Sequence, residues 1–268
     1  MSKSTDHLLS IMAKLRDPLG GCPWDVEQDF SSIAPYTIEE AYEVADAVAR
    51  GDMTDLKNEL GDLLFQVVFH AQMASEAGHF TYEDVANSVS DKMVRRHPHV
   101  FSDAVIESAD AQTFAWEDIK ARERLSARDK SVLADIPVAL PALTRAEKLQ
   151  KRAARVGFDW DSTEMVLDKI KEEVAEVEAE TNAALDGDRD GMAEEIGDLL
   201  FTCANLARKW GIDPETALRK GNDKFERRFR AMEAYFQDTG TEMTSLSLEQ
   251  MEEAWVMVKN AQREPSPS

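Results

Sequence analysis

The stretch NELGDLLF at residues 58–65 lies inside a long apolar pattern that decides the fold class. Between residues 52 and 77 the apolar side chains recur at steps of three and four, which is the period of one face of an α-helix. These positions are Leu56, Leu60, Leu63, Leu64, Val67, Val68 and Ala71. Gly51 precedes the pattern and Gly78 follows it, as residues that punctuate helices do. The stretch predicts a long amphipathic helix.

The same period continues along the rest of the chain, and strand-like alternation is scarce. Further helices are expected over residues 6–16, 37–50, 82–96, 111–125, 142–155, 164–185, 189–210, 214–236 and 248–262. Asp213 followed by Pro214 is a favourable helix start, because aspartate caps a helix and proline fits its first turn. The sequence therefore predicts an all-α protein.

Several strings of the chain occur twice. EEAYEV at 39–44 is echoed by EEVAEV at 172–177, and NELGDLLF is echoed by EEIGDLLF at 194–201. DKMVRR at 91–96 has its counterpart in DKFERR at 223–228. The pairs follow one another in the same order at nearly constant separations, which indicates internal duplication. We predict tandem duplicated helical-bundle modules.

The joint between the copies is expected where Pro137 and Pro141 interrupt the helical periodicity. We then expect a first module at residues 1–125, a linker at 126–141 and a second module at 142–262. A disordered tail is expected at 263–268.

The charge balance argues against some kinds of partner. The 268 residues carry 52 acidic and 31 basic side chains, a formal charge of −21, which repels a nucleic-acid backbone. Two cysteines, Cys22 and Cys203, are too few for a disulfide framework. The N-terminal residues lack the apolar run of a signal peptide, and no run is long enough to span a membrane. We expect a cytoplasmic protein that binds neither nucleic acid nor a membrane.

The repeated strings place acidic residues on the core side of a helix. Glu40 and Glu43 are three residues apart, so their side chains share one side of the helix. At about 100° per residue, Glu40 falls between Ala47 and Val44, within the arc expected to face the core. A carboxylate in that position loses hydration and needs a compensating partner.

The next helix carries a second acidic pair, Glu59 and Asp62, and Gly61 between them leaves room for a close neighbour. An antiparallel pairing of the two helices would bring the four carboxylates together, and clustered anions need a cation. Hard oxygen ligands of this kind suit Mg²⁺ or Mn²⁺. The second copy supplies the matching acids Glu173, Glu176, Glu195 and Asp198. The competing interpretation is a set of solvated acids, helped by a capping box from Thr37 to Glu40.

Basic residues also gather in each copy, near the end of one predicted helix and in its counterpart. They are Lys92, Arg95, Arg96, Lys224, Arg227 and Arg228. In so acidic a chain they are candidates for binding phosphate oxygens, although alone they are also typical of a helix C-terminus. An aromatic face for a base and a further cation are expected from Trp116, Lys120, Trp255 and Lys259. His97 and His99 lack an acid-xx-His spacing and are expected to be structural.

The chain resembles the MazG family of nucleoside triphosphate pyrophosphohydrolases over nearly its whole length. The motifs that carry the resemblance are GCPWD at 21–25, APYTIEEAYEV at 34–44, ELGDLLFQVVF at 59–69, RRHPHVF at 95–101 and VGFDW at 156–160. The second copy departs from the pattern, because it lacks the proline of GCPWD and the RRHPHVF extension. The resemblance implies modules of the all-α NTP pyrophosphatase type. It also implies Mg²⁺-dependent hydrolysis of NTPs and dNTPs to monophosphate and pyrophosphate, in a homodimer that packs helices of different subunits around each site.

Roles for single residues are implied as well. The resemblance implies metal binding by Glu40, Glu43, Glu59, Asp62, Glu173, Glu176, Glu195 and Asp198. It implies contacts with the triphosphate for Lys92, Arg96, Lys224 and Arg228, and a place beside the nucleotide for Trp255. Both copies keep all four metal positions, so the motif leaves open which copy is active.

Carboxylates and cations, without a serine, cysteine or histidine nucleophile, point to a metal-assisted hydrolysis. Bound ions would lower the pKa of a water, and Glu39 or Glu172 at the rim would accept its proton. Two other functions remain open. A di-iron carboxylate bundle would want Glu-xx-His pairs, but Asp62 and Asp198 stand at those positions. A non-catalytic nucleotide sensor on the same fold would bind the triphosphate without cleaving it.

Overall fold

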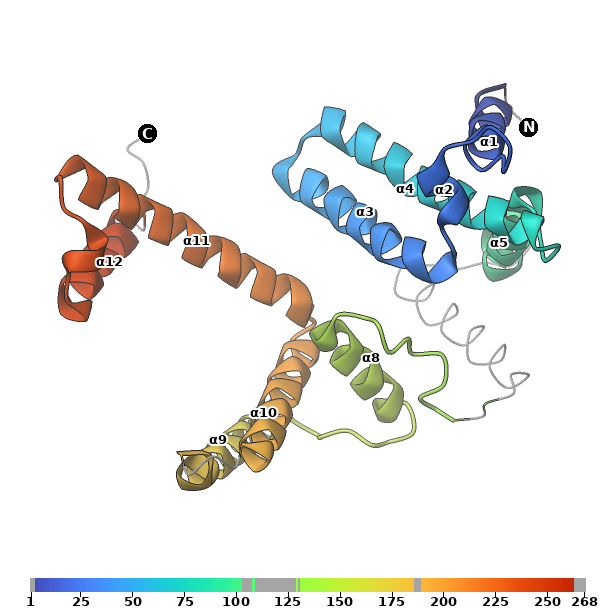
Figure 1. Cartoon of the computed structure of the whole chain (residues 1–268). Coiled ribbons are helices and arrows are strands. Elements are labelled where there is room, and N and C mark those ends of the chain that lie inside the picture. The colour runs from blue at the N-terminus through green and yellow to red at the C-terminus, as the bar shows by residue number, and fades with distance from the viewer. Residues whose placement is uncertain (1–2, 103–107, 109–128, 130, 186–188, 263–268) are drawn as a thin grey trace. The chain divides into compact units, whose positions relative to one another are not determined.

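The computed structural model describes residues 3–102, 108, 129, 131–185 and 189–262. The chain divides into two compact units, Met1–Glu123 and Arg124–Ser268. Within the described ranges every regular element is a helix, which confirms the predicted all-α class (Figure 1).

The first unit is built around two long antiparallel helices, α3 and α4, that pack along their length (Figure 1). Its elements are α1 (Lys3–Leu15), α2 (Pro23–Glu27), α3 (Phe30–Arg50), α4 (Met53–Glu76), α5 (Tyr82–Arg96) and α6 (Pro98–Phe101). Gly51 ends α3 with φ of 70°, a left-handed conformation that glycine adopts without strain. Asp52 then caps α4 by accepting hydrogen bonds from the backbone of Thr54 and Asp55. This two-residue turn fixes the antiparallel register of the pair.

Helix α3 begins seven residues before the predicted start at Thr37. Its cap is Asp29, whose carboxylate accepts from the backbone of Ser31 and Ser32, while the Ser32 hydroxyl accepts from the Asp29 backbone. The capping box from Thr37 to Glu40, which belonged to the competing interpretation of solvated acids, is therefore not formed. Thr37 lies inside the helix, and its hydroxyl is 3.1 Å from the ring nitrogen Nε2 of His70 on α4.

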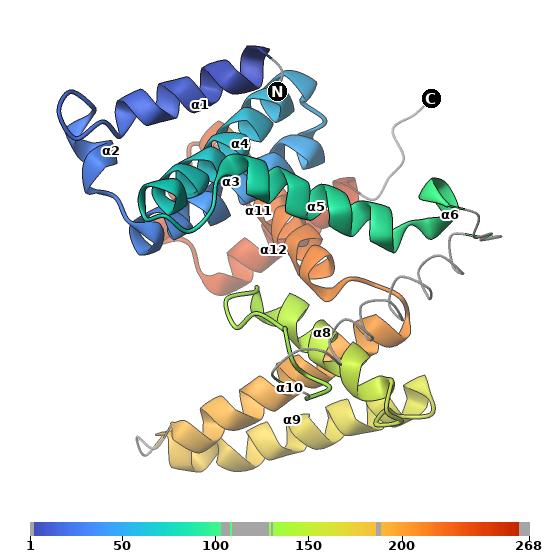
Figure 2. The same cartoon turned by 90° about the vertical axis from the view of Figure 1, so that its right-hand side faces the viewer.

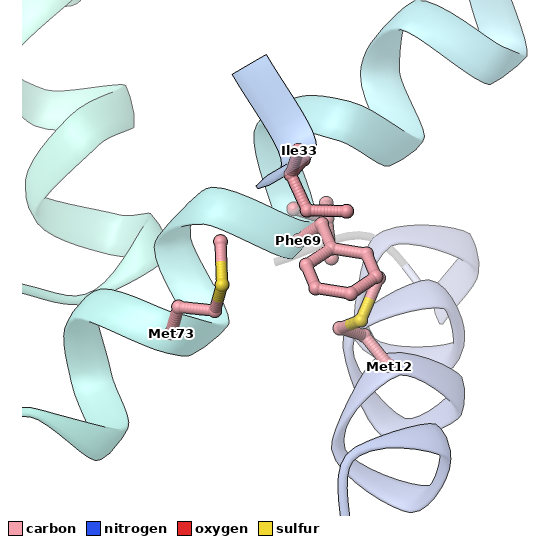
Figure 3. Packing of buried hydrophobic residues seen from close by; sticks show 5 residues of the cluster. Met12, Ile33, Phe69 and Met73 are labelled. Carbon is pink, nitrogen blue, oxygen red and sulfur yellow. The ribbon is translucent and has the colours of Figure 1, made fainter. Parts of the chain in front are cut away.

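The core of the first unit lies where α1 crosses α4. Met12 of α1, Ile33 of α3 and the α4 residues Phe69 and Met73 point toward one another, together with Val68 (Figure 3). The predicted apolar stripe of α4 is fully buried only in its C-terminal half, and Leu56 and Leu63 are half-buried. Its earlier members Leu60, Leu64 and Val67 are exposed.

The second unit repeats the long antiparallel pair, here α9 and α10, which lie side by side in both views (Figures 1 and 2). Its elements are α8 (Ala142–Ala154), α9 (Thr163–Leu185), α10 (Asp190–Lys209), α11 (Pro214–Asp238), the 3₁₀ turn η1 (Met243–Ser245) and α12 (Leu248–Ala261). Asp213 caps α11 and Pro214 stands in its first turn, as predicted. A small core of Met232, Phe236, Ala254 and Val258 holds α11 against α12.

The expected helix boundaries agree with the observed ones to within a few residues, apart from the start of α3. Helices α2 and α6 were not predicted. The expected helix at 111–125 and the tail at 263–268 lie outside the described residues. Helix α8 begins at Ala142, where the second module was expected to begin. None of the helices in the described ranges is both long and apolar enough to cross a membrane.

Candidate metal centres

The seam between α3 and α4 gathers three carboxylates of the first unit. One oxygen atom from each of Glu40, Glu43 and Glu59 lies within 4.8 Å of the others. Glu40 and Glu43 share a face because they are three residues apart, and Glu59 meets them because α4 runs antiparallel to α3. This arrangement is the one the sequence predicted for these three residues.

The fourth predicted ligand, Asp62, is exposed and stands outside this group of three. Its charge nevertheless reaches the cluster. Burial raises the pKa of the Glu40 carboxyl above its ordinary value, and the charges of Asp62 and Glu43 raise it further, whereas a side-chain hydrogen bond with Gln66 acts in the opposite direction. Burial likewise raises the pKa of Glu59. Mutual repulsion of this kind is what a bound cation would relieve.

The seam between α9 and α10 gathers the corresponding acids of the second unit. One oxygen atom from each of Glu173, Glu195 and Asp198 lies within 4.8 Å of the others. Burial raises the pKa of Glu195, followed by the charges of Glu176 and Asp198. The predicted ligand Glu176 therefore lies near the cluster but outside the group of three.

The two clusters differ in which of the four predicted acids lies outside the group of three. In the first unit it is Asp62, the last acid along the chain, and in the second it is Glu176, the second acid. The close neighbour expected at Gly61 is not observed, because a Cβ there would meet no atom within 4 Å, and the same holds for Gly197. Both glycines face open space in their own unit.

Two residues of the clusters were missed by the sequence analysis. Lys169 donates to Glu172 at 2.7 Å and to Glu173 at 2.9 Å, and these bonds raise the pKa of its ammonium group. Gln66, buried on α4, contacts Glu40. Helical spacing pointed to both, since Lys169 precedes Glu173 by four residues and Gln66 follows Asp62 by four.

Both clusters have the donor chemistry of a site for a hard divalent cation, because every converging atom is a carboxylate oxygen. In the second cluster the Glu173 side chain is only 4% exposed. Its Oε2 atom is buried, and no hydrogen bond from the described residues reaches it. A buried anionic oxygen without a donor is costly, so an ion ligated by this atom fits the site.

The predicted proton acceptors stand at the rim. Glu39 is exposed on α3 and is not among the converging carboxylates. Glu172 is exposed on α9 and forms an ion pair with Lys169.

The predicted phosphate-binding residues lie on other helices than the acids. Lys92, Arg95 and Arg96 occupy the last two turns of α5, while Lys224, Arg227 and Arg228 lie on α11, which continues from the end of α10 toward α12 (Figure 1). The Arg228 guanidinium stands 5.9 Å from the centre of the Trp255 ring on α12. Lys259 is half-buried on the same helix. Trp116 and Lys120 lie outside the described residues.

The histidines of RRHPHVF pair with each other. The rings of His97 and His99 are 5.7 Å apart, and Nδ1 of His97 is 2.8 Å from the backbone oxygen of Met93. Neither histidine belongs to a group of potential metal ligands among the described residues.

Comparisons with known proteins show the relationship of the chain. The family model of the MazG nucleotide pyrophosphohydrolase domain matches it twice, at residues 28–101 and 161–232. A nucleoside triphosphate pyrophosphohydrolase of Escherichia coli strain K12 is 55% identical, over 95% of this chain and 96% of its own length. The nucleoside triphosphate pyrophosphohydrolase/pyrophosphatase MazG of Thermotoga maritima is 43% identical over 95% of each chain. The nucleoside triphosphate pyrophosphohydrolase of Mycolicibacterium smegmatis is 39% identical over 56% of this chain and 46% of its own.

The two matches of the family model cover the long helix pair of each unit. They confirm the predicted tandem duplication. The chain belongs to the MazG family of nucleotide pyrophosphohydrolases.

Proposed function

We propose that the chain hydrolyses nucleoside triphosphates and their deoxy forms to the monophosphate and pyrophosphate, with Mg²⁺ as the cofactor and Mn²⁺ as a substitute. The observation that supports this most is the carboxylate cluster that recurs at the seam of a long helix pair in both units. The names of the relatives from Escherichia coli and Thermotoga maritima support the same activity. Control of the nucleotide pool is the physiological role we infer.

The ligands of the ions are the eight acids predicted from the sequence. They are Glu40, Glu43, Glu59 and Asp62 in the first unit, and Glu173, Glu176, Glu195 and Asp198 in the second. Divalent ions held there would neutralise the triphosphate and acidify a water molecule. Asp62 and Glu176, which lie outside the groups of three, would supply further carboxylate oxygens to such an ion.

The chain's own groups supply the remaining chemistry. Glu39 or Glu172 takes the proton of the attacking water. The triphosphate binds Lys92, Arg95, Arg96, Lys224, Arg227 and Arg228, whose charges stabilise the negative charge that develops on the leaving group. The base stacks beside Trp116 and Trp255, with Lys120 and Lys259 as further cations.

We propose that the protein is a homodimer. Each long helix pair leaves apolar residues exposed at corresponding positions of α4 and α10, namely Leu60, Leu64, Ile196 and Leu200. Burial of these side chains against another copy removes apolar surface from water. Gly61 and Gly197, which face open space in their own units, let a partner helix approach closely. Helices of the second subunit would then bring cations to the acidic seams.

The test uses the full chain and paired substitutions, Glu40→Gln with Glu43→Gln and, separately, Glu173→Gln with Glu176→Gln. Wild-type protein, incubated with ATP or dGTP and Mg²⁺, is expected to release pyrophosphate and monophosphate in equal amounts. Each double variant shows which unit is active, and the combined variant is expected to lose the activity by at least about a hundredfold. Persistent pyrophosphate release from the combined variant would disprove the metal assignment. Binding without turnover by the wild type would favour the nucleotide sensor.

A further inference from the structure

The two carboxylate clusters have matching acids, but they differ in the side chains that contact the first acid of each, Glu40 and Glu173. In the second cluster, Nζ of Lys169 lies 2.9 Å from Oε1 of Glu173 and 2.7 Å from Oε1 of Glu172. The Lys169 side chain is 30% exposed and that of Glu173 is 4% exposed, so the ammonium group partly shields a carboxylate that water hardly reaches. An ion pair with one desolvated partner is stronger than a surface pair.

The first cluster has no ammonium group at the corresponding place. The residue four positions before Glu40 is Tyr36, whose ring meets Trp24 edge-on at 5.9 Å. The side chains that hydrogen-bond with Glu40 are those of Glu43 and of the neutral amide Gln66. Among the described residues, the first ligand of the second cluster thus has an ammonium group beside it, whereas no such ion pair is formed by Glu40.

We propose that Lys169 is a built-in counter-ion of the second carboxylate cluster, which competes with the divalent ion and weakens its binding there in the absence of nucleotide. This inference rests on the proposed function in so far as the second cluster is a metal site.

The reason is electrostatic. A divalent ion bound by Glu173 would lie within a few ångströms of the Lys169 ammonium group. The repulsion between the ion and the ammonium group opposes binding of the ion. Without an ion, the same ammonium offsets the repulsion among Glu173, Glu195 and Asp198. Lys169 therefore stabilises the metal-free state and disfavours the loaded one. Both effects lower the affinity for a free ion.

The experiment measures Mn²⁺ binding to the full chain by calorimetry and by the spin-resonance signal of free Mn²⁺. The background carries Glu40→Gln and Glu43→Gln, which silence the first cluster. Adding Lys169→Met is expected to tighten Mn²⁺ binding roughly tenfold, since a unit charge next to the ion is removed. The matched control is Lys171→Met. Lys171 lies on the same helix, but its exposed side chain pairs with Asp168, so no change in affinity is expected.

The reciprocal variant introduces the counter-ion where it is absent. Tyr36→Lys, in a chain that carries Glu173→Gln and Glu176→Gln, is expected to weaken Mn²⁺ binding at the first cluster by a comparable factor. This arm decides the question even if Lys169→Met disturbs folding. Unchanged or weaker binding in Lys169→Met, or unchanged binding in Tyr36→Lys, overturns the inference and leaves the metal site standing. A different outcome is that the wild type binds Mn²⁺ but the background chain, with its first cluster silenced, binds none. That result overturns the second metal site itself and the inference with it.

Discussion

Among single residues, Arg16 joins more segments of the first unit than its position near the end of α1 suggests. Its guanidinium donates to both carboxylate oxygens of Glu76 on α4 and to the backbone oxygens of Asp25 and Gln28. It also stands 5.4 Å from the centre of the Phe69 ring in the core. The side chain is only 9% exposed, so its donors have little access to water. One buried cation thus ties α1, α2 and α4 together.

Replacing this residue should therefore be costly. We expect Arg16→Met to lower the free energy of unfolding of the first unit by about 2–3 kcal/mol, because it leaves Glu76 without its ion-pair partner and two backbone oxygens without this donor. Urea unfolding followed by circular dichroism measures the change. The control is Lys14→Met, which removes an exposed cation from the same helix. An equal effect of the two substitutions would contradict the role given to Arg16.

The same ion pair makes stability depend on pH. Burial acts to raise the pKa of Glu76, but the hydrogen bonds from Arg16 and Gln72 outweigh it and hold that pKa below its ordinary value. A carboxyl with a lowered pKa in the folded state stabilises the fold above its unfolded pKa of about 4.3. That contribution is lost as the pH falls through the folded pKa. The difference in unfolding free energy between wild type and Glu76→Gln is thus expected to be constant from neutral pH down to about 5 and to shrink below about 4. A difference that grows on acidification would refute the assignment.

Among the elements, α3 shows how a local cap can override a helix breaker. Pro35 lies inside α3, where a proline disfavours a helix, yet the helix begins five residues before it. The proline removes only the hydrogen bond to the carbonyl of Ser31, which is exposed and can bond to water instead. The capping box of Asp29 and Ser32 satisfies the backbone donors before it.

The cap should therefore stabilise α3 measurably. Asp29→Ala is expected to lower the free energy of unfolding of the first unit by about 1 kcal/mol. Metal affinity should stay unchanged, since Glu40 lies three helical turns further on. Ser31→Ala serves as the matched control, because it leaves the backbone N–H that Asp29 accepts from. Thermal unfolding monitored by calorimetry compares the stability of the Asp29→Ala and Ser31→Ala variants. A change in Mn²⁺ affinity with Asp29→Ala would show that the cap also positions the carboxylate cluster.

The whole molecule carries exposed apolar stripes that a single chain does not cover within either unit. We expect Leu200→Glu to shift the protein from dimer to monomer in light scattering at micromolar concentration, because the substitution puts a charge into the proposed contact. Leu64→Glu should act in the same way on the first unit. The control is Leu19→Glu in the loop after α1, where the side chain is 97% exposed and belongs to no stripe. A dimer that survives both stripe variants would exclude these faces as the interface.

The sequence by itself determined the helices, the duplication and the acids. Helical period, capping residues and the spacing of Glu40 with Glu43 are local properties, and they act within a few residues along the chain. They placed the long helices to within a few residues, except at α3, which Asp29 caps well before the expected start at residue 37.

Only the tertiary structure decided which carboxylates meet. The register of two packed helices brings together Glu40, Glu43 and Glu59. The same kind of register leaves Asp62 and Glu176 outside the groups of three. The same holds for Gln66, which reaches Glu40 across that seam. These contacts join residues far apart in sequence, and their geometry follows from packing across the helix seam, which no local pattern encodes.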